Sequence, residues 1–472
     1  MASKKIALIL SLLLILLTGV SEAQSTRPKT EQELAREIYK QFIEVQSGFS
    51  TGSTTPLVDV AATYLKTAGF SSKDIFIGGA NPRKANIVVR YHGTGEQKPI
   101  LLLAHTDVVE AKPSDWSMNP FKLFEKEGYF YGRGTLDDKA QAAMWIANLI
   151  QYKREGFKPK RDIIVALTAD EEGHGPYNGV SWLLKNHKDL IDADFALNEG
   201  GWVDVAHGKK ISQNIQVSEK YILNFRIDVI NKGGHSSLPT KDNAIYRLAR
   251  ALNHLSQFDF PLKTNEITAL YFKKLAAFET GAISKDMFDV TKNSQQAMAR
   301  IANRSTQWNA MLRTTCTPTM LEGGHAINAL PQLARVTINC RVLPEDSPEI
   351  VEQLLRKTIN DSHVQLTRLT RKNYSQASSP NPEVLKTVST ITQKFWPDVP
   401  TIPVMVTGAT DGRFLRAAGI PTYGVMGLVL DREDIRAHGR DERISVQSFY
   451  EGQAFLYELV KQLAGEAMKT AA

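Results

Sequence analysis

The stretch Leu101-Leu102-Leu103-Ala104-His105-Thr106-Asp107 decides how the chain folds. A short apolar run that ends abruptly in polar residues predicts a buried parallel strand, and open α/β sheets place their sites at the C-terminal edge of such strands. His105 is then a metal ligand with Asp107 as its partner, or both are ordinary polar residues at a strand end. One His-x-Asp pattern does not decide between these interpretations, so the rest of the chain must.

Two later apolar runs end in the same manner. Ile163–Leu167 leads to Asp170-Glu171-Glu172, and Phe195–Leu197 leads to Asn198-Glu199-Gly200. The runs at residues 101–104 and 163–167 are each followed by a segment with the apolar spacing of a helix. Residues 112–131, which lie between the first run and its helix, predict a loop. Strands that alternate with helices indicate an α/β fold with a mainly parallel, doubly wound sheet. We therefore expect three successive strands to carry His or carboxylate side chains to one edge of that sheet.

The pattern changes from about Val217. Residues 221–229 alternate like a half-exposed antiparallel strand, and residues 262–312 predict mostly helical, polar structure. The parallel-sheet pattern resumes with a helix at residues 382–395. The sequence thus predicts a catalytic domain that is interrupted by an inserted α+β lid or dimerisation domain. The predicted divisions are a signal peptide at 1–23, the first part of the catalytic domain at 24–216, the insert at 217–372 and the second part at 373–472.

The overall composition is that of an ordinary globular enzyme with two or three domains. The 472 residues carry a formal net charge of +7, and the basic residues mostly alternate with acidic ones. Because the sequence has no dense Lys/Arg block, it argues against a nucleic-acid partner.

The N-terminal segment predicts a cleavable signal peptide. Lys4 and Lys5 precede an apolar run from Ile6 to about Val20, and Ser21-Glu22-Ala23 offers small residues at the cleavage site. The run is shorter than the ~20 residues of a membrane span, and no cysteine follows it to carry a lipid. We expect a secreted or periplasmic protein without a stable membrane anchor, cut after Ala23.

The chain has only two cysteines, Cys316 and Cys340. If they lie on neighbouring antiparallel strands, a disulfide is geometrically possible, but they could equally be two small buried hydrophobic residues. Two cysteines cannot build a thiolate zinc cluster, so any metal must be held by His and carboxylate side chains.

Crowded carboxylates point to a binuclear metal site. Several acidic groups at one sheet edge repel one another, and two divalent cations would remove that penalty. Such a site needs one bridging carboxylate, together with one His and one further carboxylate for each metal. Mixed nitrogen and oxygen ligation favours zinc, with cobalt or manganese as substitutes. The six candidate side chains, which include one carboxylate left over for proton transfer, are His105, Asp137, Glu171, Glu172, Glu199 and His438.

The order of these motifs resembles that of the di-zinc aminoacylase/carboxypeptidase family of metallopeptidases, over about residues 30–465. The stretch Tyr131–Lys139 is most similar to the branch of carboxypeptidase S and N-acyl-amino-acid hydrolases. The motifs that carry the resemblance are His105-Thr106-Asp107, Gly132-Arg133-Gly134-Thr135-Leu136-Asp137, Asp170-Glu171-Glu172, Asn198-Glu199-Gly200 and His438.

The resemblance implies a role for each ligand of two zinc ions. His105 and Glu199 would hold one ion, Glu172 and His438 would hold the other, and Asp137 would bridge them.

Further residues at the same site receive roles from the resemblance. Glu171 would be the general base that takes a proton from a bridging water and returns it to the leaving amine. Asp107 would hydrogen-bond the His105 ring and fix its tautomer. Asp138 occupies a position that varies in the family, so we expect a surface carboxylate or one that lies behind the ligands.

Residues of the insert are implied in substrate binding. His235 resembles a histidine that reaches the site of a neighbouring subunit, which implies a homodimer through the inserted domain. Asn328 and Arg341 resemble residues that bind the backbone and the carboxylate of the substrate, and Arg suits that task through its bidentate fork. The structural alternatives are a loop-ordering role for His235, a turn at Asn328 and a surface salt bridge for Arg341.

The predicted function is hydrolysis of an amide bond next to a free carboxylate, as a zinc exopeptidase of the carboxypeptidase or dipeptidase type. The alternative is an N-acyl-amino-acid amidohydrolase, and an inactive peptide-binding scaffold is a third interpretation. The substrate would be a small peptide or an N-acyl amino acid. Thr410, with Asp411 and Arg413, is expected to line the same pocket.

Overall fold

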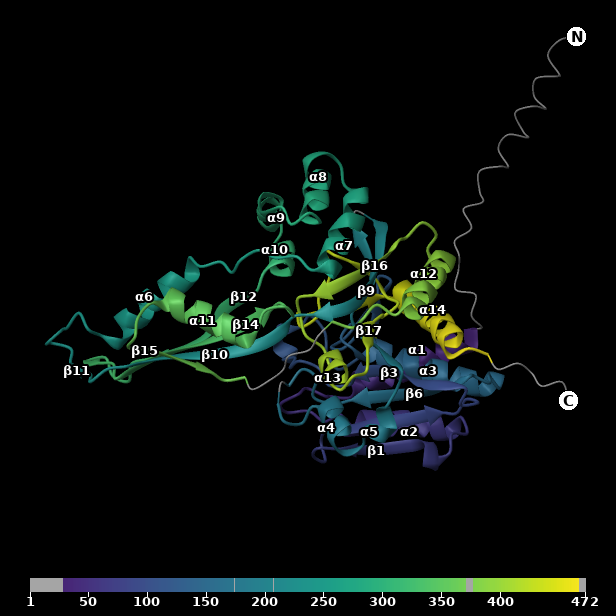
Figure 1. The fold of residues 1–472 in the computed structure, drawn as a ribbon. Coiled ribbons are helices and arrows are strands. Elements are labelled where there is room, and N and C mark those ends of the chain that lie inside the picture. The colour runs from purple at the N-terminus through teal and green to yellow at the C-terminus, as the bar shows by residue number, and fades with distance from the viewer. Residues whose placement is uncertain (1–28, 174, 207, 371–376, 467–472) are drawn as a thin grey trace, which may run out of the picture.

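The computed structural model describes residues 29–173, 175–206, 208–370 and 377–466, and Figure 1 shows their arrangement. The signal peptide predicted at residues 1–23 lies outside the described residues. A large sheet flanked by helices forms the main body, and a smaller antiparallel sheet projects from it. None of the helices in the described part of the chain is long and apolar enough to cross a membrane.

The large sheet has ten strands in the order β1-β2-β6-β3-β7-β17-β9-β8-β18, and β16 pairs with β9 off this path. Its centre is parallel, because β3 pairs in parallel with both β6 and β7, and β17 continues in parallel from β7. β1 pairs with β2, β2 with β6 and β8 with β9 in antiparallel fashion, whereas β8 pairs in parallel with β18. The predicted mainly parallel α/β sheet is confirmed. The bounds are β1 (Ile75–Gly79), β2 (Ala85–Tyr91), β3 (Gln97–His105), β6 (Arg161–Thr168), β7 (Phe195–Asn198), β8 (Val203–Ala206), β9 (Lys209–Glu219), β16 (Thr401–Val406), β17 (Thr422–Gly424) and β18 (Val429–Asp431).

Helices cover both faces of this sheet, which explains the unbroken apolar run of β3. Leu101 and Leu103 lie in the core of one face, whereas Ile100 and Leu102 lie in the core of the other. Successive side chains of a strand point to opposite faces, so a strand buried on both sides must be apolar throughout. One face carries α1 (Lys29–Glu44), α2 (Thr55–Thr67), α3 (Lys139–Glu155), α12 (Pro382–Phe395) and α14 (Val446–Ala464), and the other carries α4 (Gly179–Asn186), α5 (Lys188–Ile191) and α13 (Gly412–Ala417).

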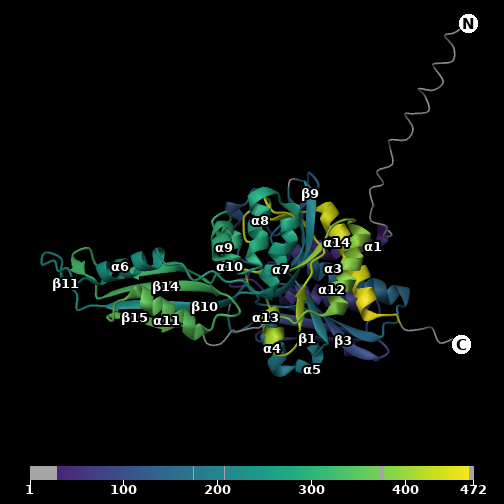
Figure 2. The same ribbon diagram turned by 45° about the horizontal axis from the view of Figure 1, so that its top comes forward.

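The projecting part, which we call the antiparallel domain, is a four-stranded sheet in the order β12-β14-β10-β15 with two helices on it. Figure 2 shows it extending to one side of the molecule, with the short β11–β13 pair at its far tip. Cys316 of β12 and Cys340 of β14 are register partners and form a disulfide, so the first of the two alternatives holds. The elements are β10 (Tyr221–Ile230), β11 (Gly234–His235), α6 (Ala244–Ser256), β12 (Thr315–Gly323), β13 (Ala329–Leu330), β14 (Leu333–Val342), α11 (Pro348–Ile359) and β15 (Val364–Arg368).

Four helices between α6 and β12, which we call the helical segment, pack on the large sheet rather than on the antiparallel domain (Figure 1). Their apolar core includes Ile402 and Val404 of β16. The predicted helices of residues 262–312 are present, and besides their exposed polar residues they contain buried apolar side chains of their own. The helices are α7 (Glu266–Leu275), α8 (Gly281–Val290), α9 (Gln295–Ala302) and α10 (Thr306–Leu312).

A three-stranded sheet stands where a loop was predicted at residues 112–131. It consists of β4 (Phe124–Lys126), β5 (Tyr129–Tyr131) and β19 (Arg443–Ser445), with β5 in the centre. Its pairing of β5 with β19 brings the Gly132–Asp137 loop beside the segment that carries His438. Three single turns of 3-10 helix lie at Ser72–Asp74, Pro113–Asp115 and Ala276–Phe278.

Candidate metal centre

The central parallel strands bring the predicted site residues together at one edge of the large sheet. His105 is the last residue of β3 and is the register partner of Thr168 at the end of β6. Glu171 and Glu172 follow β6, and Glu199 directly follows β7. Because β6, β3 and β7 are adjacent, the carboxyl ends of all three strands meet at this edge.

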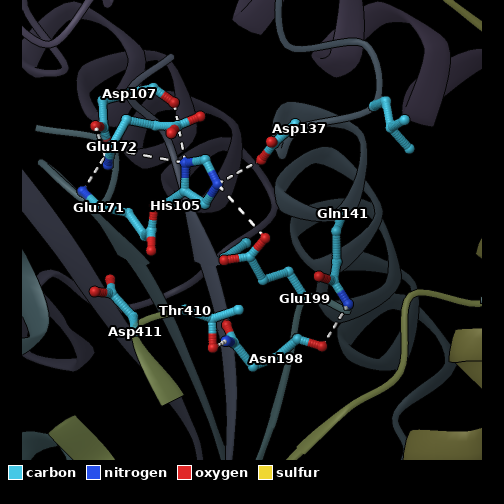
Figure 3. Close-up of polar contacts among 12 residues, drawn as sticks. His105, Asp107, Asp137, Gln141, Glu171, Glu172, Asn198, Glu199, Thr410 and Asp411 are labelled. Atoms are coloured by element: carbon cyan, nitrogen blue, oxygen red, sulfur yellow. Dashed lines mark hydrogen bonds and ion pairs between the residues drawn. The ribbon is translucent and has the colours of Figure 1, made fainter. Parts of the chain in front are cut away.

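One group of possible metal ligands consists of His105, Asp137 and Glu199. His105 Nε2 lies 2.8 Å from Asp137 Oδ1 and 3.8 Å from Glu199 Oε2. Figure 3 shows the two carboxylates pointing at the same edge of the His105 ring. The His105 side chain is almost fully buried, so this group lies at the bottom of the site.

The second group consists of Asp137, Glu172 and His438. His438 Nε2 lies 2.9 Å from Glu172 Oε1 and 3.1 Å from Asp137 Oδ2. Asp137 therefore offers one carboxylate oxygen to each group, which is the arrangement a bridging carboxylate requires. His438 comes from the loop before β19 and is the more exposed of the two histidines.

The charges of the site fit bound cations. Burial raises the pKa of Glu199 well above its ordinary value, His105 opposes this rise, and Glu171 and Asp137 add repulsion. Hydrogen bonds to Asp137 and Glu172 raise the pKa of His438 to about 10, although burial works against them. The crowded negative charge that raises these pKa values also attracts a metal cation. A bound cation would stabilise the ionised carboxylates and take the place of the protons. The mixed nitrogen and oxygen donors suit divalent ions such as zinc.

Asp107 is hydrogen-bonded to the His105 ring, as predicted, but the group that accepts is its backbone carbonyl oxygen rather than its carboxylate. His105 Nδ1 lies 3.0 Å from the Asp107 carbonyl oxygen, whereas the Asp107 carboxylate is 3.8 Å from the ring. That carboxylate accepts the backbone N–H groups of Glu171 and Glu172, each at 3.1 Å. Burial raises the pKa of Asp107 to about 6 against the opposing charge of His105. Asp107 thus fixes both the ring and the loop after β6.

Glu171 lies next to both ligand groups with one carboxylate oxygen free. Within the described residues, Glu171 Oε1 has no hydrogen-bond partner, and Arg413 Nη1 is 3.8 Å away. Burial raises the pKa of Glu171 well above its ordinary value, while His105 and Arg413 oppose the rise. A buried carboxylate with a free oxygen can accept a proton and hold it.

Arg341 of β14 reaches this side of the site from the antiparallel domain. Burial lowers the pKa of the Arg341 guanidinium, Arg413 lowers it further and Glu171 raises it, which places the three groups within electrostatic range. The predicted substrate-binding residue Arg341 is therefore near the metal centre in the same chain. Arg341 and Arg413 together give this side of the site a positive charge.

Thr410 and Asp411 lie at the base of the site, where Figure 3 shows them below the His105 ring. The Thr410 hydroxyl donates to Glu219 Oε2 at 2.8 Å and accepts from Asn198 Nδ2 at 3.3 Å. Asp411 accepts from Asn178 Nδ2 at 2.5 Å, which ties it to the loop before α4. These bonds hold the chain that follows β16 against the ends of the central strands.

His235 and Asn328 are not brought to the metal centre of their own chain. Both lie at the far tip of the antiparallel domain, where the Ser236 N–H donates to the Asn328 carbonyl oxygen at 3.0 Å. Both side chains are exposed, and His235 Nδ1 lies 2.7 Å from Ser237 Oγ. In this structure neither side chain belongs to the metal centre of its own chain.

Two buried carboxylates near Asp137, those of Asp138 and Glu442, differ from what the sequence indicates. Asp138 is fully buried, so the surface position considered for it is wrong. Glu442 was not singled out, yet its buried carboxylate accepts the N–H groups of Leu136 at 2.7 Å and Asp137 at 3.1 Å. The same carboxylate pairs with Arg133 Nη1 at 2.6 Å. A lone glutamate after His438 carries no motif, so only the fold reveals it.

Comparison with known proteins agrees with this geometry. The chain is 30% identical over 372 residues to the human N-fatty-acyl-amino acid synthase/hydrolase PM20D1, which covers 77% of this chain and 74% of the relative. It is 29% identical to the probable carboxypeptidase S-like 2 of Dictyostelium discoideum, over 80% of this chain and 74% of the relative.

The fold is also that of a solved structure, the M20 family metallo-carboxypeptidase Sso-CP2 from Sulfolobus solfataricus. The two align with a TM-score of 0.67 at 18% identity, over 90% of this chain and 98% of the other. The model of peptidase family M20/M25/M40 matches residues 101–462, which begin at the apolar run of β3 and end in α14. The chain therefore belongs to peptidase family M20/M25/M40 and is a metallohydrolase of that family.

Proposed function

We propose that the chain hydrolyses an amide bond next to a free carboxylate, with two divalent metal ions held by the two ligand groups. The observation that carries this proposal is the placement of Asp137, whose two oxygens face His105 and His438 separately. Zinc is the metal that these groups favour, with cobalt or manganese as substitutes. His105, Glu199, Glu172 and His438 complete the ligand set.

The residues of the chain divide the work of hydrolysis. When bound, the metal ions supply Lewis acidity, which lowers the pKa of a water toward about 7 and polarises the amide carbonyl. Glu171 takes a proton from the attacking water and delivers it to the leaving amine. The raised pKa of Glu171, caused mainly by its burial, allows this carboxyl group to hold the proton between the two steps.

Arg341 and Arg413 are placed to recognise the free carboxylate of the substrate. Both guanidinium groups act electrostatically on Glu171, the residue that protonates the leaving amine. A carboxylate on the amine side of the scissile bond would lie between them and gain charge-assisted hydrogen bonds. Peptides and N-acyl amino acids both have this group, which agrees with relatives described as carboxypeptidases and as N-acyl-amino-acid hydrolases.

Replacing Glu171 with Gln tests the proposal. The variant should keep both metal ions, because Glu171 belongs to neither ligand group, but hydrolysis should fall by about 10²–10⁴-fold because the proton acceptor is lost. Metal content by elemental analysis and kcat/KM on dipeptides and N-acyl amino acids are the measurements. Glu433→Gln, an exposed glutamate-to-glutamine change, is the matched control. Unchanged turnover in Glu171→Gln would contradict the assignment of the base.

We further propose that the protein is a homodimer that associates through the antiparallel domain. His235 and Asn328 lie far from their own metal centre and are exposed, as a contribution to a second molecule requires. β12 is an edge strand of its sheet, and its Met320 and Leu321 side chains are 61% and 69% exposed. Exposed apolar edge strands are sites of association.

Export of the protein is also proposed, with cleavage after Ala23 and a final location outside the cytoplasm. The Cys316–Cys340 disulfide supports this, because such bonds persist mainly in oxidising compartments.

A further inference from the structure

A largely apolar cavity of about 320 Å³ lies beside the metal centre. Asp137 and Glu199 line it, so it adjoins the ligand group at the bottom of the site. Trp202, Val404 and Met426 supply apolar walls. A volume of this size falls in the range of ligand-binding pockets, which are mostly apolar with a few polar groups.

The helical segment supplies part of the cavity wall. Tyr271 of α7 and Met311 of α10 both line it, and both also belong to the buried core that the segment forms with β16. The cavity thus exists because residues 266–312 pack on the large sheet instead of on the antiparallel domain.

Trp202, Asp204 and Asn214 of the cavity wall are hydrogen-bonded to one another or to neighbouring residues, whereas Gln216 Oε1 has no partner within the described residues. The Trp202 indole N–H donates to Asp204 Oδ1 at 2.8 Å, and Asn214 Nδ2 and Arg432 Nη2 donate to Asp204 Oδ2 at 2.9 and 2.6 Å. The hydrogen-bonding capacity of the Asp204 carboxylate is therefore used by its neighbours. A ligand that enters the cavity meets mainly the apolar surfaces of Trp202, Met311 and the residues between them.

The residues that line the cavity are not those that carry or contact the positive groups beside Glu171. The lining includes Asp137, Glu199 and Thr410 but neither Glu171 nor Arg413. Consider a substrate whose free carboxylate faces Arg413 and whose leaving amine faces Glu171. The acyl part of such a substrate can extend past Asp137 and Glu199, which line the cavity.

We propose that this cavity binds the apolar chain of an N-acyl amino acid, and that Met311 and Tyr271 set the longest chain it accepts. The proposal rests on amide hydrolysis at the metal centre and names the substrate class of that site. Met311 and Met426 suit a flexible chain, because methionine side chains are unbranched and adapt to irregular contacts. Each methylene group that enters should raise kcat/KM about fourfold, the effect of burying one methylene.

The test compares kcat/KM for acetyl, butyryl, octanoyl and dodecanoyl forms of one amino acid, with a dipeptide as reference. The zinc-loaded wild type should gain activity with chain length. Met311→Trp fills part of the cavity, so it should keep activity on the acetyl form and lose the gain for octanoyl and dodecanoyl forms. Leu270→Trp, on the same segment but at an exposed position that does not line the cavity, should keep the wild-type preference. Met311→Ala enlarges the cavity and should shift the preference toward longer chains.

Binding of dodecanoate to zinc-loaded protein, measured by calorimetry, separates this inference from the proposed function. Wild type and Leu270→Trp should bind it, and Met311→Trp should bind it at least tenfold more weakly. If dodecanoate binds in this manner but no amide is hydrolysed, the proposed function is wrong and the cavity assignment stands. If dipeptides are hydrolysed but chain length changes neither kcat/KM nor binding in folded wild type and Met311→Trp, the cavity assignment is overturned and the proposed function stands.

Discussion

Glu442 supports the backbone of Asp137 but belongs to neither ligand group. It accepts hydrogen bonds from the N–H groups of Leu136 and Asp137, while Arg133 pairs with its second oxygen. Burial raises the pKa of Glu442, and the charge of Arg133 opposes this. A buried side chain thus anchors the loop that presents the shared carboxylate.

Replacing Glu442 with Gln should weaken metal binding by about 10–100-fold, the usual effect of losing a group that orients a ligand. The amide cannot accept from both N–H groups and from Arg133, so a buried positive charge loses its partner. The free energy of unfolding should fall by about 3 kcal/mol. Zinc titration under conditions where the variant remains folded measures the first effect, and chemical denaturation measures the second. Glu433→Gln should leave both quantities unchanged, and a zinc affinity equal to wild type in Glu442→Gln would contradict this role.

Local sequence patterns predict residues at strand ends but not those that support them from a distance. His105, Glu171 and Glu199 could be predicted because each follows an apolar run whose two buried faces require continuous hydrophobic residues. Glu442 could not, because its partners at residues 133–137 are far away in the chain and are reached only through the pairing of β5 with β19.

The same limit applies to whole elements. The apolar run of β3 and the alternation of β10 each show which faces are buried, so the two sheets could be predicted as separate units. The helical segment was predicted from periodicity, but its packing on β16 depends on surfaces that lie far apart in the sequence. Periodicity identifies a helix without showing which surface it covers.

The strand pair β12–β14 provides a test of the proposed export. If the chain matures outside the cytoplasm, protein purified without reductant and then denatured should contain no free thiol, because Cys316 and Cys340 are joined. Its N-terminal residue should be Gln24. Thiol titration and N-terminal sequencing of the same sample make the measurement. Two titratable thiols on a chain that still begins at Met1 would contradict export.

A single chain keeps His235 apart from its own metal centre. In the proposed dimer, each site would receive His235 from the other subunit. Mixing the inactive variants His235→Ala and Glu171→Gln should then restore activity, because a mixed dimer has one site with Glu171 in its own chain and an intact His235 from the partner subunit. Random reassociation should give roughly a quarter of the wild-type rate.

Subunit exchange is followed by the return of activity over time after mixing, with sedimentation to show the dimer. Each variant mixed with itself should stay inactive. Full activity of a monomeric species, or the absence of rescue in a demonstrated mixed dimer, would show that His235 has no part in the neighbouring site.

The part of the cavity wall that the helical segment supplies is encoded by one uninterrupted stretch of the chain, whereas the ligands of the metal centre come from segments before and after it. Inherited changes between residues 266 and 312 can therefore alter what the protein accepts while the reaction itself is preserved. If the cavity binds the acyl chain as proposed, changes in this stretch alter substrate choice without changing a metal ligand. This separation gives the lineage a simple way to diversify its substrates.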